Sequence, residues 1–375
     1  MPPIYLDYNA TTPIDPAVRE AMLPFLGEMF GNPSSTHILG KAALRAVTKA
    51  RHQVAGLINA GDSEIEFTSG GTEASNQVIK GVMLSGEPRD NHIIISNIEH
   101  PATYKPCEYL KALGCQVTVV PADSQGMIDP NDIRRAITPR TRLISIMHSN
   151  NEIGTLMPIQ EIAVIARERN VLIHADAAQS MGKVIVDVQD LGVDFLSIAG
   201  HKLYAPKGIG ALYIRAGVDL PCFIHGAGQE NGRRAGTENV PYIVGLGKAA
   251  ELAEIALPEA TDKLRTLRDR LEELLKEALG DRLVINGHPE NRLPNTANVS
   301  FLGKIGSELL EDCPGIAAST GAACHEGQFI MSPIFHALGI SEPVGMGAVR
   351  LTVGRFTTEA EMDVAAEMLG HAATT

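Results

Sequence analysis

Tryptophan is absent from this chain of 375 residues, and aromatic residues make up only 4% of it. Surfaces that stack nucleic-acid bases are built from aromatic side chains, so such a surface is not expected here. Positive charge is in deficit as well, because 32 lysines and arginines face 44 aspartates and glutamates, for a formal net charge of −12. Nucleic acid is therefore a poor candidate partner. The 44% of hydrophobic and 20% of charged residues are typical of a globular protein and exclude a disordered one.

Long apolar segments are also missing. No run of roughly 18 or more apolar residues occurs, so no membrane-spanning helix is expected. The start of the chain, Met1–Tyr5, has neither the basic nor the apolar region of a signal peptide. We therefore expect a cytoplasmic protein.

The cysteines do not form a recognisable framework. They are Cys107, Cys115, Cys222, Cys313 and Cys324. Their number is odd and no pair has the C-x-x-C spacing, so neither a disulfide scaffold nor a zinc cluster is indicated, and no metal site is expected. Most free cysteines are small buried hydrophobic residues, and only the local sequence can indicate a reactive one.

Short apolar runs alternate with amphipathic helical patterns between residues 65 and 215. The strand candidates are His92–Ser96, Gln116–Val120, Leu143–Met147, Val171–Ala175, Asp194–Ile198 and Gly210–Ile214. The helical patterns between them include Thr72–Leu84, Ala102–Leu113 and Ile159–Arg169. This alternation predicts an α/β fold, with a mostly parallel sheet covered on both faces. Ligands of such sheets bind at the carboxyl ends of the strands, so functional residues are expected directly after each strand.

A second region begins near Pro258. Its elements are a helix with an apolar stripe at Leu264, Leu267, Leu271, Leu274 and Leu275, and short strands near Leu283–Ile285, Asn298–Phe301 and Val349–Val353. These patterns predict a smaller α+β domain. We expect a large domain at residues 13–258 and a small domain formed by residues 1–12 and 259–375.

A candidate anion site lies in the segment Glu66–Glu73, where a short strand ends in serine and glycine and a helix then begins. The free N–H groups and the positive dipole end of that helix suit a phosphate, in a turn that includes Gly71, and Thr72 offers a hydroxyl. A capped helix without a ligand is the alternative. The segment is not a P-loop, because no G-x-x-x-x-G-K-[ST] motif occurs.

Two neighbouring strand candidates end in an acid and an amine, Asp176 and Lys202. A salt bridge is one explanation of the pair. The other is a pyridoxal phosphate (PLP) site, which needs an amine to form a Schiff base and an acid to keep the pyridine nitrogen protonated. The candidate phosphate site upstream favours the PLP interpretation.

Other polar residues follow strands or lie in polar segments. His100 could stack on a cofactor ring, shuttle protons or simply cap a helix. Asn151 could contact a substrate carboxylate or belong to a turn. Arg350 has the planar fork that suits a carboxylate, although a surface ion pair is also possible.

Two glycine-rich segments complete the set. The loop Gly226–Thr237 carries arginines and is long enough to be functional. The segment Ala318–Gln328 surrounds Cys324 with small residues, which indicates a mobile, accessible loop and a thiol available for chemistry.

Together these segments resemble the cysteine desulfurases, a family of fold-type I PLP-dependent enzymes, over essentially the whole chain. Further matching blocks are Tyr5–Thr12, Phe30–Ser35 and Gly354–Thr358. The number, order and spacing of the blocks make the resemblance specific. It implies the fold-type I transferase architecture, in which a mostly parallel, seven-stranded sheet forms the large domain.

The resemblance also implies roles around the cofactor. Lys202 would bind PLP covalently and move the Cα proton. Asp176 would pair with the pyridinium nitrogen, Gln179 would contact the ring hydroxyl and His100 would stack on the ring. The phosphate would be bound by Thr72, by His201 and by Thr237 of a neighbouring subunit, which implies a homodimer.

For the substrate L-cysteine, the resemblance implies that Asn151 and Arg350 hold the α-carboxylate. Cys324 would attack the substrate sulfur, so that L-alanine leaves and a persulfide remains on Cys324. That sulfur would pass to an acceptor or scaffold protein for iron–sulfur clusters, thio-nucleosides or cofactors. The segment around Cys324 resembles the branch of the family in which it swings between the active site and the acceptor.

Two features depart from the common pattern. Ala199 stands where many members of the family have a serine that binds phosphate, so one contact is missing. The string Ala322-Ala323-Cys324-His325 resembles selenocysteine lyases, which leaves release of selenium from L-selenocysteine as an alternative function. A non-catalytic protein of the same fold and an ordinary aminotransferase are less consistent with Lys202 and Cys324, respectively.

Overall fold

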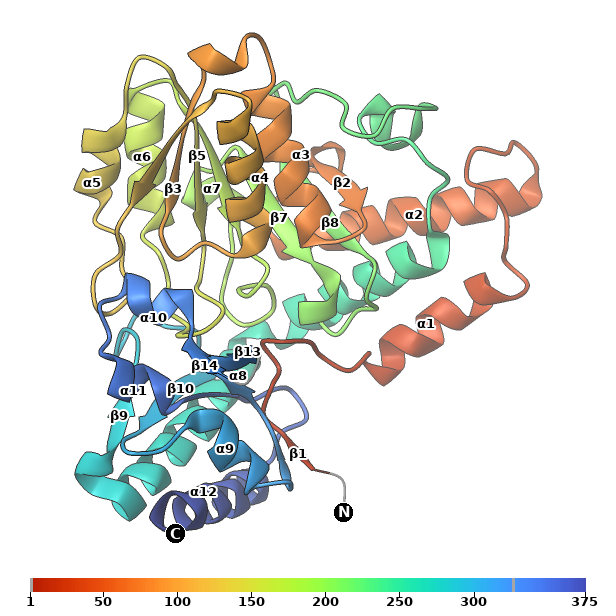
Figure 1. Ribbon diagram of the computed structural model, residues 1–375. Coiled ribbons are helices and arrows are strands. Elements are labelled where there is room, and N and C mark those ends of the chain that lie inside the picture. The colour runs from red at the N-terminus through yellow and green to blue at the C-terminus, as the bar shows by residue number, and fades with distance from the viewer. Residues whose placement is uncertain (1–2, 326–327) are drawn as a thin grey trace.

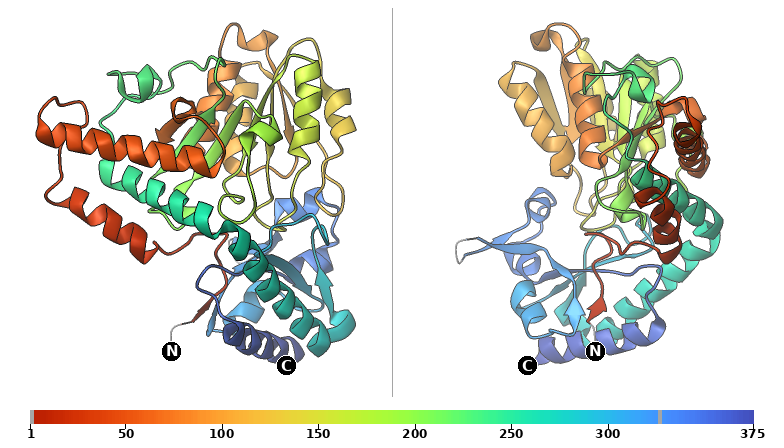
Figure 2. Two further views of the ribbon diagram at one scale, coloured as in Figure 1. Left: turned by 180° about the vertical axis from the view of Figure 1, so that it is seen from behind. Right: turned by 90° about the vertical axis from the view of Figure 1, so that its right-hand side faces the viewer.

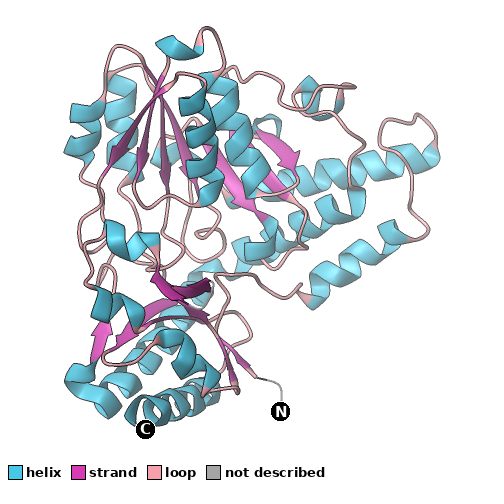
Figure 3. Cartoon of the chain, viewed as in Figure 1, coloured by secondary structure: helices cyan, strands magenta, loops and turns pink. Residues whose placement is uncertain are grey.

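Seven strands form the central sheet of the large domain (Figures 1 and 3). The computed structural model describes residues 3–325 and 328–375, with the backbone alone for residues 322–325 and 328–330. In spatial order the strands are β2 (Ile65–Thr68), β8 (Gly210–Ile214), β7 (Phe195–Ala199), β6 (Leu172–Asp176), β5 (Thr141–Met147), β3 (His92–Ser96) and β4 (Gln116–Val120). Only β8 runs antiparallel to its neighbours within this sheet. The predicted mostly parallel, seven-stranded sheet is confirmed.

Helices cover both faces of this sheet, as Figures 1 and 2 show. One face is covered by α3 (Gly71–Met83) and α4 (Pro101–Ala112), which bury residues such as Val78 and Leu110 against the strands. The opposite side carries α1 (Pro16–Leu26), α2 (Ile38–Leu57), α5 (Pro130–Ala136), α6 (Ile159–Glu168), α7 (Val188–Leu191) and the first half of α8 (Val240–Leu279). Because both faces are covered, a central strand such as β3 is fully buried and can consist of consecutive isoleucines.

The small domain has an antiparallel sheet with its own core. The strands are β12 (Ser319–Thr320), β15 (Ala348–Thr352), β10 (Thr296–Phe301) and β9 (Leu283–Ile285), in that order. The second half of α8, α9 (Gly306–Glu311) and α12 (Glu359–Thr374) pack on this sheet. A separate parallel pair, β1 (Ile4–Tyr5) with β11 (Ile316–Ala317), ties the N-terminal segment to this domain.

One helix connects the two domains. The leucine-striped helix was expected to follow Pro258, but α8 begins at Val240 and contains Pro258 within it. The helix continues through the proline because both halves bury apolar residues, the first in the large core and the second in the small one. The proposed division at 258/259 therefore falls within α8 and stays a prediction.

The segment around Cys324 also differs from expectation. Ala322–His325 forms strand β13 and pairs antiparallel with β14 (Gln328–Met331), so the backbone is a β-hairpin where a loop was expected. Two short helices follow it, α10 (Pro333–Ala337) and α11 (Glu342–Met346). Phe335 of α10 joins the core of the large domain, so the residues after the hairpin pack between the two domains. No helix in the described ranges is long and apolar enough to cross a membrane.

Candidate active site

A cavity of about 450 Å³ opens at the carboxyl ends of the parallel strands, beside the N-terminal segment and β15. Its position agrees with the general rule for open α/β sheets. Nine predicted site residues line it: Gly71, Thr72, His100, Asn151, Asp176, Gln179, His201, Lys202 and Arg350. We call this cavity the front pocket.

Asp176 is the last residue of β6 and lies in the base of the front pocket. Its side chain is 8% exposed, and one carboxylate oxygen accepts a hydrogen bond from the N–H of Ala178 at 3.0 Å. Burial raises the pKa of Asp176, while this hydrogen bond, His100 and Lys202 lower it. A buried carboxyl with one protein donor is well suited to pair with a cationic N–H group, such as a protonated pyridine nitrogen.

Lys202 follows β7 and reaches the same pocket from the next strand. Its Nζ donates to the carbonyl oxygens of Asn9 and Ala10, the latter at 2.7 Å. Burial and the Arg350 guanidinium lower the pKa of Lys202 to about 8, against the opposing effect of Asp7 and Asp176. A substantial neutral fraction at moderately alkaline pH gives this amine the nucleophilicity needed to condense with an aldehyde.

Two histidines flank the lysine. His100 is the N-cap of α4, and its Nδ1 accepts the N–H of Ala102 at 3.1 Å. Desolvation lowers the pKa of His100, Lys202 also lowers it, and Asp176 raises it. His201 contacts the Thr11 hydroxyl at 3.2 Å, and burial lowers the pKa of its imidazole to about 4, so it is neutral at pH 7.

The first turn of α3 forms the far end of the pocket. Gly71 and Thr72 begin this helix, where backbone N–H groups have no partner within the helix and the dipole is positive. Gly70 has a φ of 151°, which only glycine readily adopts. A Cβ added to Gly210 of β8 would lie 2.7 Å from the Gly70 Cα, so the turn lies close to the sheet. A Cβ added to Gly71 would lie 3.4 Å from the Cβ of Ala199, which confirms that Ala199 borders this turn.

Arg350 lies in the middle of β15 and closes the other end of the pocket. It donates to the Asn151 carbonyl at 2.9 Å and to Asp7 and Ser319 at 2.8 and 3.0 Å. Within the part of the chain that the structure describes, its Nε and the Asn151 Oδ1 are buried without a hydrogen-bond partner. A buried polar group without a partner lowers the stability of the fold. An arginine N–H together with the N–H₂ of an amide can bind a carboxylate.

Two predicted residues lie elsewhere. Thr237 is exposed in the loop before α8 and does not line the front pocket. Cys324 belongs to β13, but its side chain lies outside the part of the structure that is described. The base of its hairpin is nevertheless anchored beside the pocket, because the Ser332 hydroxyl donates to Glu152 at 3.0 Å, next to Asn151.

Sequence reasoning missed three polar residues of the site. The N-terminal residues Asp7 and Asn9 contact Arg350 and Lys202, and their only sequence signal was the block Tyr5–Thr12. Glu99 is half-buried and precedes His100 in the chain, and it accepts hydrogen bonds from Ser96 and from the Met147 N–H. Burial raises the pKa of Glu99 to about 8, and Asp176 adds to this effect.

The residues present fit PLP. A buried acid, a lysine of lowered pKa and an unpaired helix N-terminus occupy separate walls of one pocket. They match the three chemical features of this cofactor, namely the ring nitrogen, the aldehyde and the phosphate.

Comparison with known proteins agrees with this geometry. The family model for aminotransferase class-V matches residues 4–364. A cysteine desulfurase IscS from Dictyoglomus turgidum is 45% identical over 368 residues, which cover 98% of this chain and 93% of that protein. Another, from Methanosarcina thermophila, is 46% identical over 369 residues and covers 98% and 91%, respectively.

A solved structure of a NifS-like protein superposes with a TM-score of 0.93 at 37% identity, over 99% of each chain. The similarity thus extends over both domains and includes every wall of the front pocket. The chain therefore belongs to the cysteine desulfurases, PLP-dependent enzymes of the aminotransferase class-V family.

Proposed function

We propose that, in this cysteine desulfurase, Cys324 receives the sulfur atom of L-cysteine as a persulfide while L-alanine is released. The observation that carries the proposal is the convergence of Asp176, Lys202 and Arg350 in one pocket. The hairpin that includes Cys324 begins next to the Arg350 end, because the Gly321 N–H donates to the Ala348 carbonyl at 2.9 Å.

The substrate carboxylate is the first group to be bound. Arg350 offers an unpaired Nε, and the side-chain amide of Asn151 can turn its N–H₂ toward a carboxylate. Asp7 holds the Arg350 guanidinium at 2.8 Å and keeps its plane in one orientation. Binding there would direct the Cα of L-cysteine toward Lys202.

Proton transfer at Cα is then assigned to Lys202. When bound, PLP supplies the electron-withdrawing ring that makes loss of this proton and cleavage of the Cβ–Sγ bond possible. The lowered pKa of Lys202, about 8, suits an amine that must both accept and return a proton near neutral pH. His100 has a lowered pKa and is a second group that can move a proton there.

Sulfur transfer is assigned to Cys324. Its thiolate attacks the Sγ of L-cysteine, so that an S–S bond forms and the Cβ–Sγ bond breaks, with the electron pair of that bond going to Cβ. A proton added at Cβ completes L-alanine, and the transferred sulfur remains on Cys324 as a persulfide. No external oxidant or reductant is needed.

The test is Cys324→Ala, with Cys222→Ala as a matched control, because Cys222 is half-buried and lies outside the front pocket. We expect Cys324→Ala to keep its PLP absorbance but to form neither L-alanine nor a protein persulfide from L-cysteine. Cys222→Ala should retain both products. Equal rates of L-alanine formation by wild type and Cys324→Ala would rule out the assigned nucleophile.

We further propose that the enzyme is a homodimer in which Thr237 contacts the phosphate bound by the neighbouring subunit. Large apolar side chains are exposed on one arm of the molecule, at Leu23, Leu26, Phe30, Ile38, Leu39 and Leu44. Phe30 and Ile38 are 75% and 80% exposed, which is typical of a protein interface. Light scattering that gave the mass of one chain would contradict this proposal.

The destination of the sulfur is proposed from the resemblance alone. Transfer to an acceptor or scaffold protein in the cytoplasm remains a prediction, and incubation of the persulfidated enzyme with candidate acceptors would test it. L-Selenocysteine is the alternative substrate, favoured by the string Ala322–His325. Turnover of L-selenocysteine much faster than that of L-cysteine would support this alternative.

A further inference from the structure

We propose that Lys183 is a positioning residue that fixes the side-chain amide of Gln179 as a hydrogen-bond donor toward the cofactor. Lys183 follows β6 in the same turn as Gln179 and makes no contact with the front pocket itself. The proposal rests on the PLP-dependent function and adds a residue to which that function assigns no role.

The hydrogen bonds of Lys183 favour one orientation of the Gln179 amide. Lys183 Nζ donates to Gln179 Oε1 at 3.1 Å and to the side-chain oxygen of Asn9 at 3.1 Å. With its oxygen held from behind, Gln179 presents Nε2 to the pocket side, where it donates to the Asn9 carbonyl at 2.9 Å. Lys202 Nζ donates to the same carbonyl, so the amide N–H₂ lies beside the lysine that binds the cofactor.

An oxygen substituent on the cofactor ring would therefore meet a donor. The ring hydroxyl of PLP is most useful in its anionic form, which an N–H group stabilises and an amide oxygen destabilises. The protonated amine has only donors and excludes the flipped amide, and the neutral amine still has two N–H groups, enough for both observed hydrogen bonds. A flipped amide would direct two oxygens, Oε1 of Gln179 and the Asn9 carbonyl, at each other and at the cofactor.

The surroundings of Lys183 indicate a specific role for this amine. Its side chain is only 6% exposed, and both of its hydrogen-bond partners are neutral amide oxygens. Burial lowers the pKa of Lys183 well below its usual range, and the cations Lys202 and Arg350 lower it further. A buried amine without a carboxylate partner is costly for stability, which points to a functional reason for its presence.

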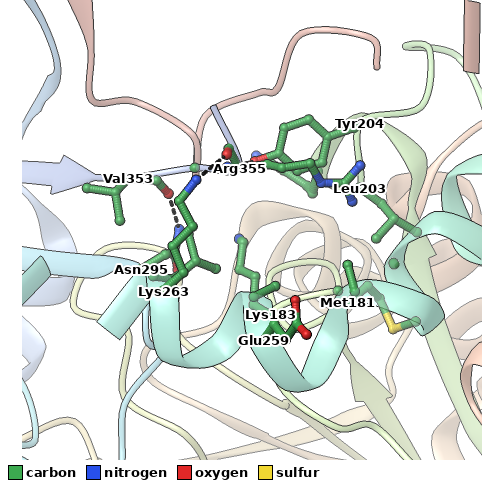
Figure 4. Close-up of a pocket in the computed structure, with 16 residues that line it drawn as sticks. Met181, Lys183, Leu203, Tyr204, Glu259, Lys263, Asn295, Val353 and Arg355 are labelled. Carbon is green, nitrogen blue, oxygen red and sulfur yellow. Dashed lines mark hydrogen bonds between the residues drawn. The ribbon is translucent and has the colours of Figure 1, made fainter. Parts of the chain in front are cut away.

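A second cavity, of about 330 Å³, lies behind Lys183 (Figure 4). We call it the rear cavity. Lys183 points into it, and the other charged side chains that line it are Lys202, Glu259, Lys263 and Arg355. Lys263 donates to the Arg355 carbonyl at 2.9 Å and is not hydrogen-bonded to Gln179 or Asn9. It therefore provides a matched control, a lysine of the same cavity without the proposed contact.

The experiment compares Lys183→Met with Lys263→Met in the PLP-loaded enzyme, by following the absorbance of bound PLP against pH. We expect Lys183→Met to raise the titration midpoint by about 0.5 to 1 pH unit, because the anionic ring oxygen loses an oriented donor. PLP affinity should fall severalfold in the same variant. Lys263→Met should leave both quantities at the wild-type values.

A double-mutant cycle separates positioning from a general loss of structure. In a Gln179→Ala background, Lys183→Met should shift the midpoint no further, since the amide that it orients is gone. An equal shift in both backgrounds would overturn the proposal. So would a wild-type midpoint in Lys183→Met, or the same shift in Lys263→Met.

If Lys183→Met does not fold, Lys183→Arg can be used to test whether an N–H donor at this position orients the Gln179 amide. The rear cavity has room for the larger side chain, and its N–H groups can hold Gln179 Oε1, so we expect the wild-type midpoint. A midpoint shifted as far as that of Gln179→Ala would overturn the proposal. Failure of wild-type protein to develop any PLP absorbance would instead contradict the PLP-dependent function.

Discussion

The front pocket and the rear cavity differ little in size, at about 450 and 330 Å³, and Lys202 lines both of them. Their chemistry differs because different elements form their walls. The ends of the parallel strands and the loops that follow them bring an acid, two histidines and side-chain amides into the front pocket, and β15 of the small domain adds an arginine. The wall that α8 gives to the rear cavity combines Ala253, Ala256 and Ala260 with the exposed charged residues Glu259 and Lys263. The front pocket therefore differs from the rear cavity less in volume than in the polar groups that converge on it from the ends of several strands.

The largest expected difference comes from removing one negative charge from each cavity. Asp176→Asn should lower L-alanine formation roughly 100-fold or more, because an amide cannot keep the ring nitrogen protonated. Glu259→Gln, in the rear cavity, should change the rate less than about twofold, because Glu259 is exposed there. Steady-state rates with L-cysteine measure both effects. A similar loss in the two variants would contradict the functional difference between the cavities.

The shared residue Lys202 gives the second prediction, which concerns uptake of PLP by the apoprotein. Only the neutral amine attacks the PLP aldehyde, and a pKa of about 8 means that protonation blocks most of it at pH 7. The uptake rate should rise about tenfold between pH 7 and pH 9 and then level off. Stopped-flow absorbance measures the rate. A rise that continued past pH 10 would show that burial does not lower the pKa of Lys202.

The smallest expected effect compares an alanine from each cavity. Ala199→Ser would restore a hydroxyl beside the first turn of α3, and one added hydrogen bond to phosphate should slow PLP release about fivefold. Ala256→Ser adds the same hydroxyl to the rear cavity and should leave PLP release unchanged. Release is measured by dialysis or by competition with an apoenzyme. An unchanged release rate in Ala199→Ser would mean that another group already satisfies the phosphate there.

Much of the large domain could be predicted, because the apolar runs and turn residues that define its strands lie within short segments of the sequence. Three strands have the predicted limits: His92–Ser96, Gln116–Val120 and Gly210–Ile214. A short apolar run between polar turns is typical of a buried strand. Asp176 and Lys202 could be placed together because parallel strands end at one edge of the sheet. The helix through Pro258 could not be predicted, because tertiary packing on two cores outweighs the local signal of a proline.

The order of residues along the chain was sufficient to predict the α/β class, the family and its cofactor PLP, and to propose Asp176 and Lys202 as residues that bind it. It could not indicate that Asn9, from the N-terminus, accepts hydrogen bonds from both Lys183 and Lys202. Nor could it indicate that Lys202 lines both the front pocket and the rear cavity. Periodicity and turn signals act over a few residues, whereas these contacts join segments more than 150 residues apart. Only packing of the folded chain brings such groups within hydrogen-bond distance.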